Sequence, residues 1–382
     1  MKTLDRLGRL AQVLALGRYP LSYDRVRYIR QLNFKQRTNF LLGSVEAKMR
    51  RINAISYPFA LQLEPTTQCQ LDCTLCPRIR ANSRSPIGHM DYDNYEKLIR
   101  ELGPYLLAVA LWQWGEPLLH PRISDMVRLA HQFGIMTMIS TNGQVNPADF
   151  DLKALFAAGL DLLIISMDGA SQDIYQKFRR GGRVEFARRF IRAAAQAKRD
   201  LKAVRPYINL RTIATSENEH EVEHVRAVAK ADGADFFSVK SVSLYYDDDP
   251  DDCRLPTEKN YRSFQYQGIE EAEAYRRMPN FCTKPWSWPT LRYDGALLVC
   301  ECDHSRQQEI GNVFQASSFR EVWHGKRARE IRYHFNREGL IDLEFCRRCR
   351  YKMDDAIRVI DPDPDTCRAP DFQALPDLKS GA

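Results

Sequence analysis

The chain has 382 residues and ten cysteines, and the first cluster of cysteines has a spacing that suits metal chemistry. Cys69, Cys73 and Cys76 form the pattern C-x3-C-x2-C. One loop of this spacing can direct three thiolates at one iron–sulfur cluster, and three ligands leave one iron of a cubane cluster open to an outside ligand. The alternatives are a zinc site completed by a residue such as His89, or buried thiols.

A second group of cysteines lies near the end of the chain. Cys282 and Cys300 enclose Gly295 in the pattern C-x12-G-x4-C, and Cys346 and Cys349 follow as C-x2-C. Four thiolates can bind a second iron–sulfur cluster or a structural zinc ion. Three cysteines have no assigned role, and these are Cys253, Cys302 and Cys367. We interpret Cys302 as an alternative ligand or a packed thiol.

The elements that must position the first group alternate regularly. Short apolar segments with strand character are separated by amphipathic helical segments, which predicts parallel strands joined by right-handed crossovers. The expected strands are 59–64, 106–113, 135–140, 162–167, 207–214 and 236–240. The fold class is therefore α/β, a partial (β/α)6 TIM-like barrel. Its chemistry is expected in the loops that follow the carboxyl ends of the strands.

The remaining parts of the chain have different compositions and define five regions. We predict a basic, helical N-terminal extension, a barrel core, a linker with an acidic run at 247–252, a small cysteine-rich α+β domain and a poorly ordered tail. Their boundaries are 1–56, 57–241, 242–280, 281–355 and 356–382.

Charge and hydropathy narrow the choice of partners and compartment. The net charge is +7, but residues 1–51 hold twelve basic and three acidic residues, so the rest of the chain is slightly acidic. This distribution argues against nucleic acid as a partner of the body. The basic arm is expected to pack over the barrel, or to contact a protein or an anionic membrane surface. With no convincing secretory signal and no run of about 18 apolar residues, we expect a reducing, cytoplasmic location.

The first cysteine motif, read as Cys69-Gln-Leu-Asp-Cys73-Thr-Leu-Cys76-Pro77, resembles the signature of the radical S-adenosylmethionine (SAM) superfamily. The resemblance covers about residues 59–355. It implies that the three cysteines hold a [4Fe–4S] cluster, whose open iron binds SAM. Reductive cleavage of SAM then gives a 5′-deoxyadenosyl radical that abstracts a substrate hydrogen. The resemblance also implies an electron donor, namely reduced flavodoxin or ferredoxin.

Further motifs fall after the following strands, where this superfamily binds SAM. Gln113-Trp114-Gly115-Glu116-Pro117 is similar to the family's Gly-Gly-Glu motif, with Trp114 in place of the first glycine. Asn142-Gly143 and Asp168-Gly169 are also common turn pairs, and Glu116 could simply begin a helix. The residues that the resemblance assigns to SAM are Leu75, Gly115, Glu116, Ser140, Asn142, Ser166 and Arg179, the last as a partner of the SAM carboxylate.

The second cysteine group resembles the SPASM and twitch domains of some radical SAM enzymes. These domains hold auxiliary clusters, and a full SPASM domain has further cysteines beyond its C-x2-C. Residues 351–360 contain none, so the resemblance implies the shorter form. Its single auxiliary [4Fe–4S] cluster would be held by Cys282, Cys300, Cys346 and Cys349, and would handle the electron left on the product.

The substrate is less constrained than the chemistry. Peptide-modifying relatives often carry a strand-rich winged-helix domain, whereas residues 1–51 are expected to be helical, so we favour a small polar, sugar-like or aminocyclitol-like substrate. The alternative is a maturase that modifies a peptide or protein. An RNA-directed enzyme and a non-catalytic electron carrier also stay open. Candidates for an acid–base or charge-binding role are Arg211, Lys240, Glu301 and His304, and none of them is assigned as catalytic.

Overall fold

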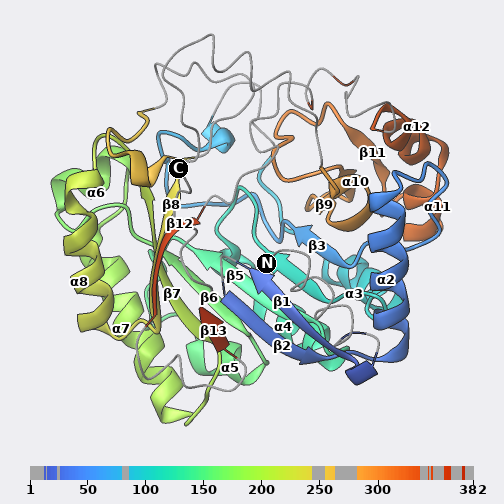
Figure 1. Ribbon diagram of the computed structural model, residues 1–382. Helices are drawn as coiled ribbons and strands as arrows, with labels where there is room; N and C mark the ends of the chain where they lie inside the picture. Colours follow the sequence, from blue (N-terminus) through green and yellow to red (C-terminus); the bar gives the residue numbers. More distant parts are fainter. Residues whose placement is uncertain are drawn as a thin grey trace.

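The computed structural model describes residues 13, 15–23, 26–79, 86–242, 254–262, 282–335, 343, 346, 357–362 and 372–374. At its centre lies a curved parallel sheet (Figure 1). Its strands are β3 (Ala60–Leu63), β4 (Ala108–Leu111), β5 (Met136–Thr141), β6 (Leu162–Ser166), β7 (Tyr207–Ala214) and β8 (Phe236–Ser241), adjacent in this order. The predicted partial (β/α)6 barrel is confirmed.

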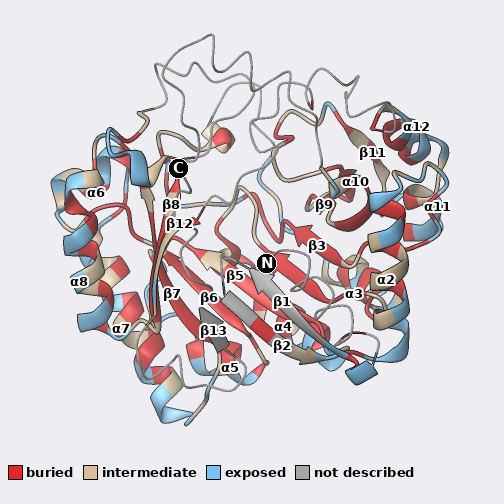
Figure 2. Cartoon of the chain, viewed as in Figure 1, coloured by how far each residue is buried: buried red, intermediate tan, exposed pale blue. Residues whose placement is uncertain are grey.

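Helices cover the convex face of this sheet, with their buried sides toward it (Figure 2). In α3, for example, Tyr95, Ile99 and Leu102 are fully buried, and the side chain of Asp91 caps the helix by accepting a hydrogen bond from the Asn94 amide. The crossover helices are α3 (Tyr92–Leu102), α4 (Ile123–Gln132), α5 (Leu152–Ala157), α6 (Gln172–Phe178), α7 (Val184–Asp200) and α8 (Val222–Asp232), with short 3-10 turns at η1 (Pro77–Ile79), η3 (Pro117–Leu119) and η4 (Glu219–Glu221).

The sheet continues beyond the barrel at both edges. On one side β9 (Thr290–Leu291) pairs parallel with β3, and β10 (Ala296–Leu298) and β11 (Glu309–Asn312) follow antiparallel. On the other side β12 (Ile357–Pro362) pairs antiparallel with β8. The cysteine-rich module therefore shares one ten-stranded sheet with the barrel.

Helices of the C-terminal module cover its hairpin. They are α10 (Lys284–Ser287), α11 (Phe319–Trp323) and α12 (Lys326–His334). The largest side chains of this core are Trp286 and Trp323, which are 1% and 0% exposed. Each indole nitrogen donates to a backbone carbonyl of the segment before β3, at Arg51 and Ser56 respectively. These bonds fix the module to the barrel because a buried indole N–H requires an acceptor.

At both chain ends the structure has strands where the sequence analysis expects none, which corrects those two expectations in part. The predicted helical extension contains an antiparallel hairpin of β1 (Arg18–Tyr23) and β2 (Val26–Gln31), followed by a single long helix, α2 (Phe34–Lys48). The predicted poorly ordered tail supplies β12 and also β13 (Phe372–Ala374), which pairs with β2. The interleaved arginines obscured the β-branched and aromatic residues of the run from Val26 to Arg30, which favour a strand.

The hairpin closes the amino-terminal end of the barrel, as Figure 1 shows for β2. Tyr28 is 1% exposed and lies in the same apolar cluster as the barrel interior, with its ring centroid 5.7 Å from that of Tyr207 at the start of β7. Arg30 forms an ion pair with Asp161, just before β6, with 2.5 Å between Nη2 and Oδ1. The described part of the extension therefore belongs to the packing of the barrel.

Helix α2 is attached to the barrel by buried polar side chains. Gln36 donates to the Leu106 carbonyl over 2.8 Å, and the Asn39 side chain accepts from the Tyr57 amide over 2.8 Å. The carboxylate of Glu46 accepts from the Ser56 hydroxyl over 2.6 Å. Because polar groups this deeply buried need their partners, α2 has one fixed position on the barrel.

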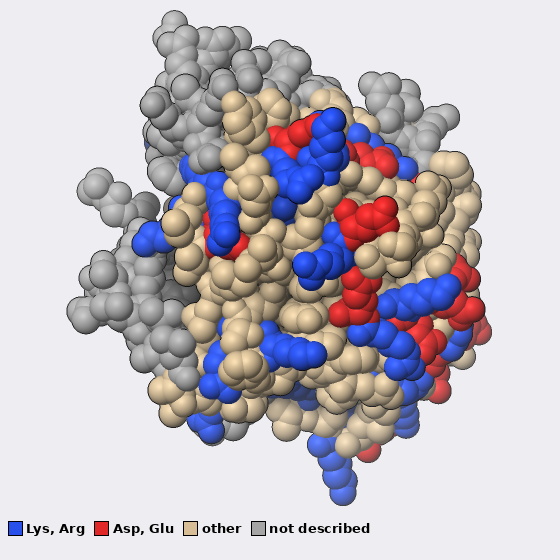
Figure 3. Space-filling view, turned by 90° about the vertical axis from the view of Figure 1, so that its right-hand side faces the viewer, with Lys and Arg blue, Asp and Glu red and all other residues tan. Residues whose placement is uncertain are grey.

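On the face that carries α2 and the C-terminal module, neither positive nor negative charge predominates among the described residues. Basic and acidic side chains are interspersed there (Figure 3). Among the described residues no helix is long and apolar enough to cross a membrane. Of the predicted linker, the described part is Val242 and residues 254–262, which carry η5 (Lys259–Tyr261).

Candidate functional site

The three clustered cysteines lie in the loop that follows β3. Backbone hydrogen bonds join this loop to the one after α6, from Asp72 N to Arg180 O (3.1 Å) and from Thr74 N to Phe178 O (3.0 Å). A further bond from Cys76 N to Cys73 O (3.0 Å) tightens the loop between two of the cysteines. The loop that holds the thiols and the loop that holds Arg179 are therefore fixed to each other.

All three thiols open into one cavity of about 240 Å³ at the carboxyl ends of the barrel strands. Every residue that the sequence assigned to SAM also lines this cavity. The lining comprises Cys69, Cys73, Leu75, Cys76, Pro77, Trp112, Gln113, Trp114, Gly115, Glu116, Ser140, Thr141, Asn142, Ser166, Phe178, Arg179, Ile213, Lys240 and Val242. The motifs, separated by more than a hundred residues in the chain, meet because parallel strands place their carboxyl ends at one edge.

Gly115 and Glu116 are held against the cysteine loop by their backbone. A Cβ atom on Gly115 would lie 2.0 Å from the Thr66 carbonyl oxygen, so this position has room only for glycine. The Glu116 amide donates to the Gln68 carbonyl over 2.7 Å. One carboxylate oxygen of Glu116 accepts from the Leu118 amide and the other from the Asn142 amide, over 3.1 and 2.8 Å. Glu116 thus caps the short helix η3, which is the role considered for it as a residue that begins a helix. It also connects the ends of β4 and β5.

The environment of Glu116 makes its charge state sensitive to what binds beside it. Its side chain is in the protein interior, and burial raises the pKa of this carboxyl to about 7, although the Asn142 amide and the Thr141 hydroxyl oppose the shift. A cationic or hydrogen-bond-donating group placed in the cavity would favour the ionised form.

Asn142 connects β5 to the first cysteine. Its side-chain nitrogen lies 3.6 Å from the Cys69 sulfur, and its amide group also exchanges hydrogen bonds with the Gln70 side chain over 3.3 Å. A donor at this distance stabilises negative charge on the sulfur, which is the charge state of a metal-bound thiolate.

Arg179 forms a buried ion pair with Asp168, which follows β6. The Arg179 Nε lies 2.5 Å from Asp168 Oδ2, and the side chains are 12% and 0% exposed. Asp168 Oδ1 accepts from the Ile213 amide over 2.6 Å, so the carboxylate is fixed from both sides. The Nη1 of Arg179 lies 3.9 Å from the Cys73 sulfur. Burial acts to lower the pKa of Arg179, but Asp168 outweighs it, and the guanidinium stays charged at the cavity wall.

The donor set fits a cubane iron–sulfur cluster. Three thiols with amide and guanidinium donors beside two of them suit a cluster bound through thiolates. Burial raises the pKa of Cys69 to about 11 and that of Cys76 to about 12, so cluster assembly must release protons from these thiols.

The alternative of a mononuclear zinc site is not supported by the position of His89. Its ring packs edge-on against His120, with centroids 5.5 Å apart, outside the set that lines the cavity. Among the described residues no three His, Cys, Asp or Glu side chains lie close enough to share one metal ion. A cluster needs no such convergence because each thiolate binds a different iron.

The second cysteine group is described in part. Cys346 is buried, and Cys282, Cys300 and Cys302 are partly buried. Cys349, Cys253 and Cys367 lie outside the described residues. The ligand set Cys282, Cys300, Cys346 and Cys349 therefore stays a prediction.

Two residues of the site were missed or left unassigned. Asp168 lies in the strand-end motif that begins at Ser166 but has no role assigned from the sequence, and its pairing with Arg179 becomes apparent only where the loop after β6 meets the end of α6. Lys240, considered without assignment, lines the cavity. The sequence feature that could have identified Lys240 is that it is the one charged residue in strand β8. Of the other candidates, Glu301 pairs with Lys284 over 2.7 Å and His304 is buried at 3% exposure.

Comparisons with known proteins identify two domains. Residues 63–245 match the radical SAM superfamily, and residues 282–350 match the SPASM iron–sulfur cluster-binding domain. These ranges contain both cysteine groups.

Individual relatives match to different extents. A tungsten-containing aldehyde ferredoxin oxidoreductase cofactor-modifying protein of Pyrococcus furiosus is 39% identical over 110 residues, which is 28% of this chain and 30% of that protein. The chain thus spans less than a third of the length of this relative. The PqqA peptide cyclase of Ruegeria pomeroyi is 25% identical over 285 residues, covering 70% of this chain and 74% of the cyclase.

Solved structures share the fold. SuiB of Streptococcus suis, bound to its precursor peptide SuiA, has a TM-score of 0.57 at 14% identity, covering 86% of this chain and 78% of SuiB. The anSMEcpe structure with AdoMet and a Kp18Cys peptide has a TM-score of 0.52 at 18% identity, covering 79% and 93%. Taken with the two domain matches and the cavity that joins the motifs, these findings show that the chain is a radical SAM superfamily enzyme with a C-terminal SPASM domain.

Proposed function

We propose that this enzyme cleaves SAM reductively at a [4Fe–4S] cluster held by Cys69, Cys73 and Cys76, and acts on a small polar, sugar-like or aminocyclitol-like substrate inside the barrel. The observation that supports SAM cleavage at this cluster is the shared cavity, which all three cysteines and all seven assigned SAM residues line. Bound there, the cluster and SAM would supply a 5′-deoxyadenosyl radical that abstracts a substrate hydrogen.

The chain's own residues would bind and orient SAM. Glu116 and the Gly115 backbone are proposed to receive its amino group, since this carboxylate is already fixed by two amides. Arg179, held by Asp168, would face the SAM carboxylate, because a guanidinium can pair with two carboxylates at different edges. Leu75, Ser140, Asn142 and Ser166 would contact the remaining parts of SAM.

The C-terminal module is proposed to hold one auxiliary [4Fe–4S] cluster on Cys282, Cys300, Cys346 and Cys349, and to accept the electron left on the product. Its contact with the barrel mouth supports this role, because the Gln113 side chain donates to the Glu301 carbonyl over 2.8 Å, one residue from Cys300. We propose reduced flavodoxin or ferredoxin as the electron donor.

A second candidate is peptide modification. A relative that is 25% identical over 70% of this chain is named a PqqA peptide cyclase. The strands of the N-terminal extension do not decide between the candidates, because they close the far end of the barrel from the cavity.

The experiment is anaerobic reconstitution followed by reduction with flavodoxin, and measurement of 5′-deoxyadenosine by mass spectrometry. The proposal expects 5′-deoxyadenosine, and a higher rate when the dialysable small-molecule fraction of a cell extract is added. Stimulation by the peptide fraction alone would favour the second candidate. SAM that binds but is never cleaved would contradict both.

A further inference from the structure

Two basic side chains face the barrel interior beside the proposed SAM site. Arg211 lies on β7 and Lys240 on β8, and the register pairs Arg211 with Ser238 and Ile213 with Lys240. Side chains two residues apart on a strand share a face. Because Ile213 and Lys240 both line the cavity, Arg211 also faces the interior, one layer deeper than Lys240.

Arg211 is positioned next to the residues assigned to SAM. It is paired in register with Ser166 on β6, which lines the cavity, and it is 7% exposed. Its Nε donates to the Ser238 hydroxyl over 3.4 Å, and Ser238 donates to the Asn209 side chain over 2.9 Å. These contacts hold the Nε edge of the Arg211 guanidinium against β8.

The acidic groups around Lys240 are each engaged elsewhere. The groups that interact electrostatically with it are Arg211, Cys302, Glu301 and Asp168. Asp168 is bound by Arg179 and the Ile213 amide, and Glu301 by Lys284 over 2.7 Å. Within the described part of the chain, the Lys240 ammonium makes no hydrogen bond or ion pair.

Such a charge in the interior has a cost that a ligand can remove. Burial, reinforced by Arg211, lowers the pKa of Lys240 to about 8, so the group is still mostly charged at neutral pH. A cation without a counter-charge in a partly desolvated site is unfavourable, and an anion that binds there regains that energy.

We propose that Lys240 and Arg211 form a binding site for a carboxylate or phosphate group, so that the substrate is an anionic small molecule. The guanidinium of Arg211 would bind two oxygens of this group. The ammonium of Lys240, on the neighbouring strand, would make a third contact with it. This inference rests on the proposed function, because it assumes that the substrate enters the same cavity as SAM.

Two other uses of the pair give different results when tested. Lys240 and Arg211 could bind the carboxylate of SAM in place of Arg179. In that case the loss of either side chain would lower the affinity for SAM. They could instead offset the charge of a cluster near Cys302, in which case their loss would alter the auxiliary cluster.

The test uses the reconstituted full-length enzyme with SAM bound, and inorganic phosphate and acetate as separate probes. Calorimetric titrations are run at pH 7 and at constant ionic strength set with chloride. The variants are Lys240→Met, Lys240→Arg, Arg211→Gln and, as a control, Lys153→Met on the surface, where Lys153 pairs with Asp200. Iron content and circular dichroism establish that each variant is folded and loaded.

We expect at least one probe to bind the wild type. Tighter binding of phosphate would indicate a phosphate site, and tighter binding of acetate would indicate a carboxylate site. Lys240→Met and Arg211→Gln should each weaken that probe by about tenfold or more, as expected for loss of a charge-assisted contact. Lys240→Arg should retain most of the affinity, and Lys153→Met all of it.

Three results would overturn the inference. These are no binding of either probe to the wild type, equal probe affinity in the wild type and Lys240→Met, or a loss of SAM affinity in Lys240→Met as large as the loss of probe affinity. An enzyme that binds the probe through Lys240 but makes no 5′-deoxyadenosine would refute the proposed function and leave the anion site standing.

Discussion

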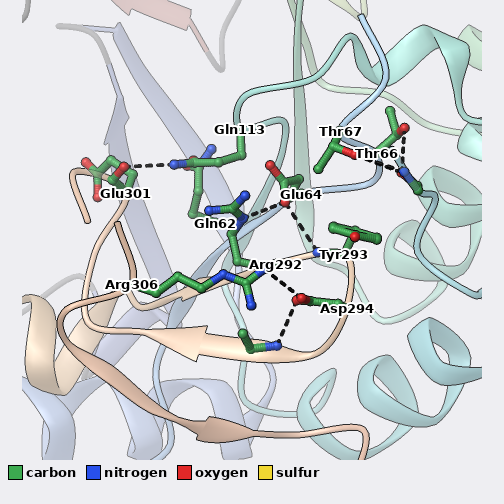
Figure 4. Close-up of polar contacts among 12 residues, drawn as sticks. Gln62, Glu64, Thr66, Thr67, Gln113, Arg292, Tyr293, Asp294, Glu301 and Arg306 are labelled. Carbon is green, nitrogen blue, oxygen red and sulfur yellow. Dashed lines mark hydrogen bonds and ion pairs between the residues drawn. The ribbon is translucent and has the colours of Figure 1, made fainter. Parts of the chain in front are cut away.

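Arg292 and Glu64 form an ion pair that joins the barrel to the C-terminal module. Arg292 Nε lies 2.6 Å from Glu64 Oε2, and the two side chains are 1% and 0% exposed (Figure 4). Glu64 follows β3 and so begins the loop that carries the three cysteines, whereas Arg292 follows β9 of the module. The pair therefore connects the two proposed cluster sites at the point where their strands lie side by side.

Breaking this pair on one side should be costly. Arg292→Ala leaves the Glu64 carboxylate buried without its counter-charge, and we expect a loss of about 3–5 kcal/mol of unfolding free energy. Urea unfolding of the reconstituted protein measures it. The matched double variant Glu64→Gln/Arg292→Met removes both charges and should lose clearly less. Equal losses in the two proteins would show that the pair is not the source of the effect.

The N-terminal hairpin should be essential for stability. Tyr28→Ala removes a buried ring that closes the barrel, and we expect about 3–5 kcal/mol of destabilisation, as for other large aromatic residues in cores. Phe34→Ala is the control, because Phe34 is 74% exposed and its loss should change stability by less than about 0.5 kcal/mol. A Tyr28 variant as stable as the control would mean that the hairpin is a separate arm after all.

His120 should make stability fall in mild acid. Its Nε2 faces the Met90 carbonyl at 2.9 Å and its Nδ1 accepts from the Arg122 amide at 3.1 Å, an arrangement that fits the neutral ring. Burial lowers the pKa of His120 below its ordinary 6.5, with a further contribution from His89. Below pH 6.5 the unfolded chain therefore binds a proton that the folded chain does not, and stability decreases until the lower folded-state pKa is reached.

Unfolding midpoints between about pH 7 and pH 5 test this. The contribution of His120 has a slope of at most about 1.4 kcal/mol per pH unit. In His120→Gln this contribution should disappear, which leaves a shallower pH dependence, although the variant is less stable at pH 7. His224→Gln, at an exposed position, should keep the wild-type slope. Parallel curves for all three proteins would contradict the assignment.

Asp168 is expected to position Arg179 for SAM. Asp168→Asn keeps the size of the side chain but removes the charge that holds the guanidinium, and we expect the affinity for SAM to fall by roughly tenfold. Equilibrium dialysis under anaerobic conditions measures it. The control is Glu185→Gln, which removes one of the two ion-pair partners of Arg192 away from the cavity and should leave SAM binding unchanged. If Asp168→Asn bound SAM with the wild-type affinity, the assignment of Arg179 to the SAM site would be contradicted.

The sequence predicts the structure best where a motif coincides with a regular spacing of apolar residues. The strand at Tyr207–Ala214 has the predicted bounds, because its apolar pattern is clear. Residues of the cavity were placed by motifs at strand ends, which the parallel sheet then brings together.

Other features depend on contacts between distant segments and could not be read from local pattern. The hairpin β1–β2 is stabilised by its place against Tyr207 and Asp161, and β12 by its pairing with β8. The pairing of Asp168 with Arg179 depends on how the loop after β6 meets the end of α6, and the neighbouring positions of Lys240 and Arg211 depend on the register between β7 and β8.

The central claim is that Cys69, Cys73 and Cys76 hold the cluster that cleaves SAM. Its most direct test compares the reconstituted wild type with a variant in which all three are replaced by alanine, measuring iron content and 5′-deoxyadenosine after reduction. The account predicts about eight irons and 5′-deoxyadenosine for the wild type, and about four irons and none of that product for the variant. A triple variant that still produces 5′-deoxyadenosine at the wild-type rate would contradict it.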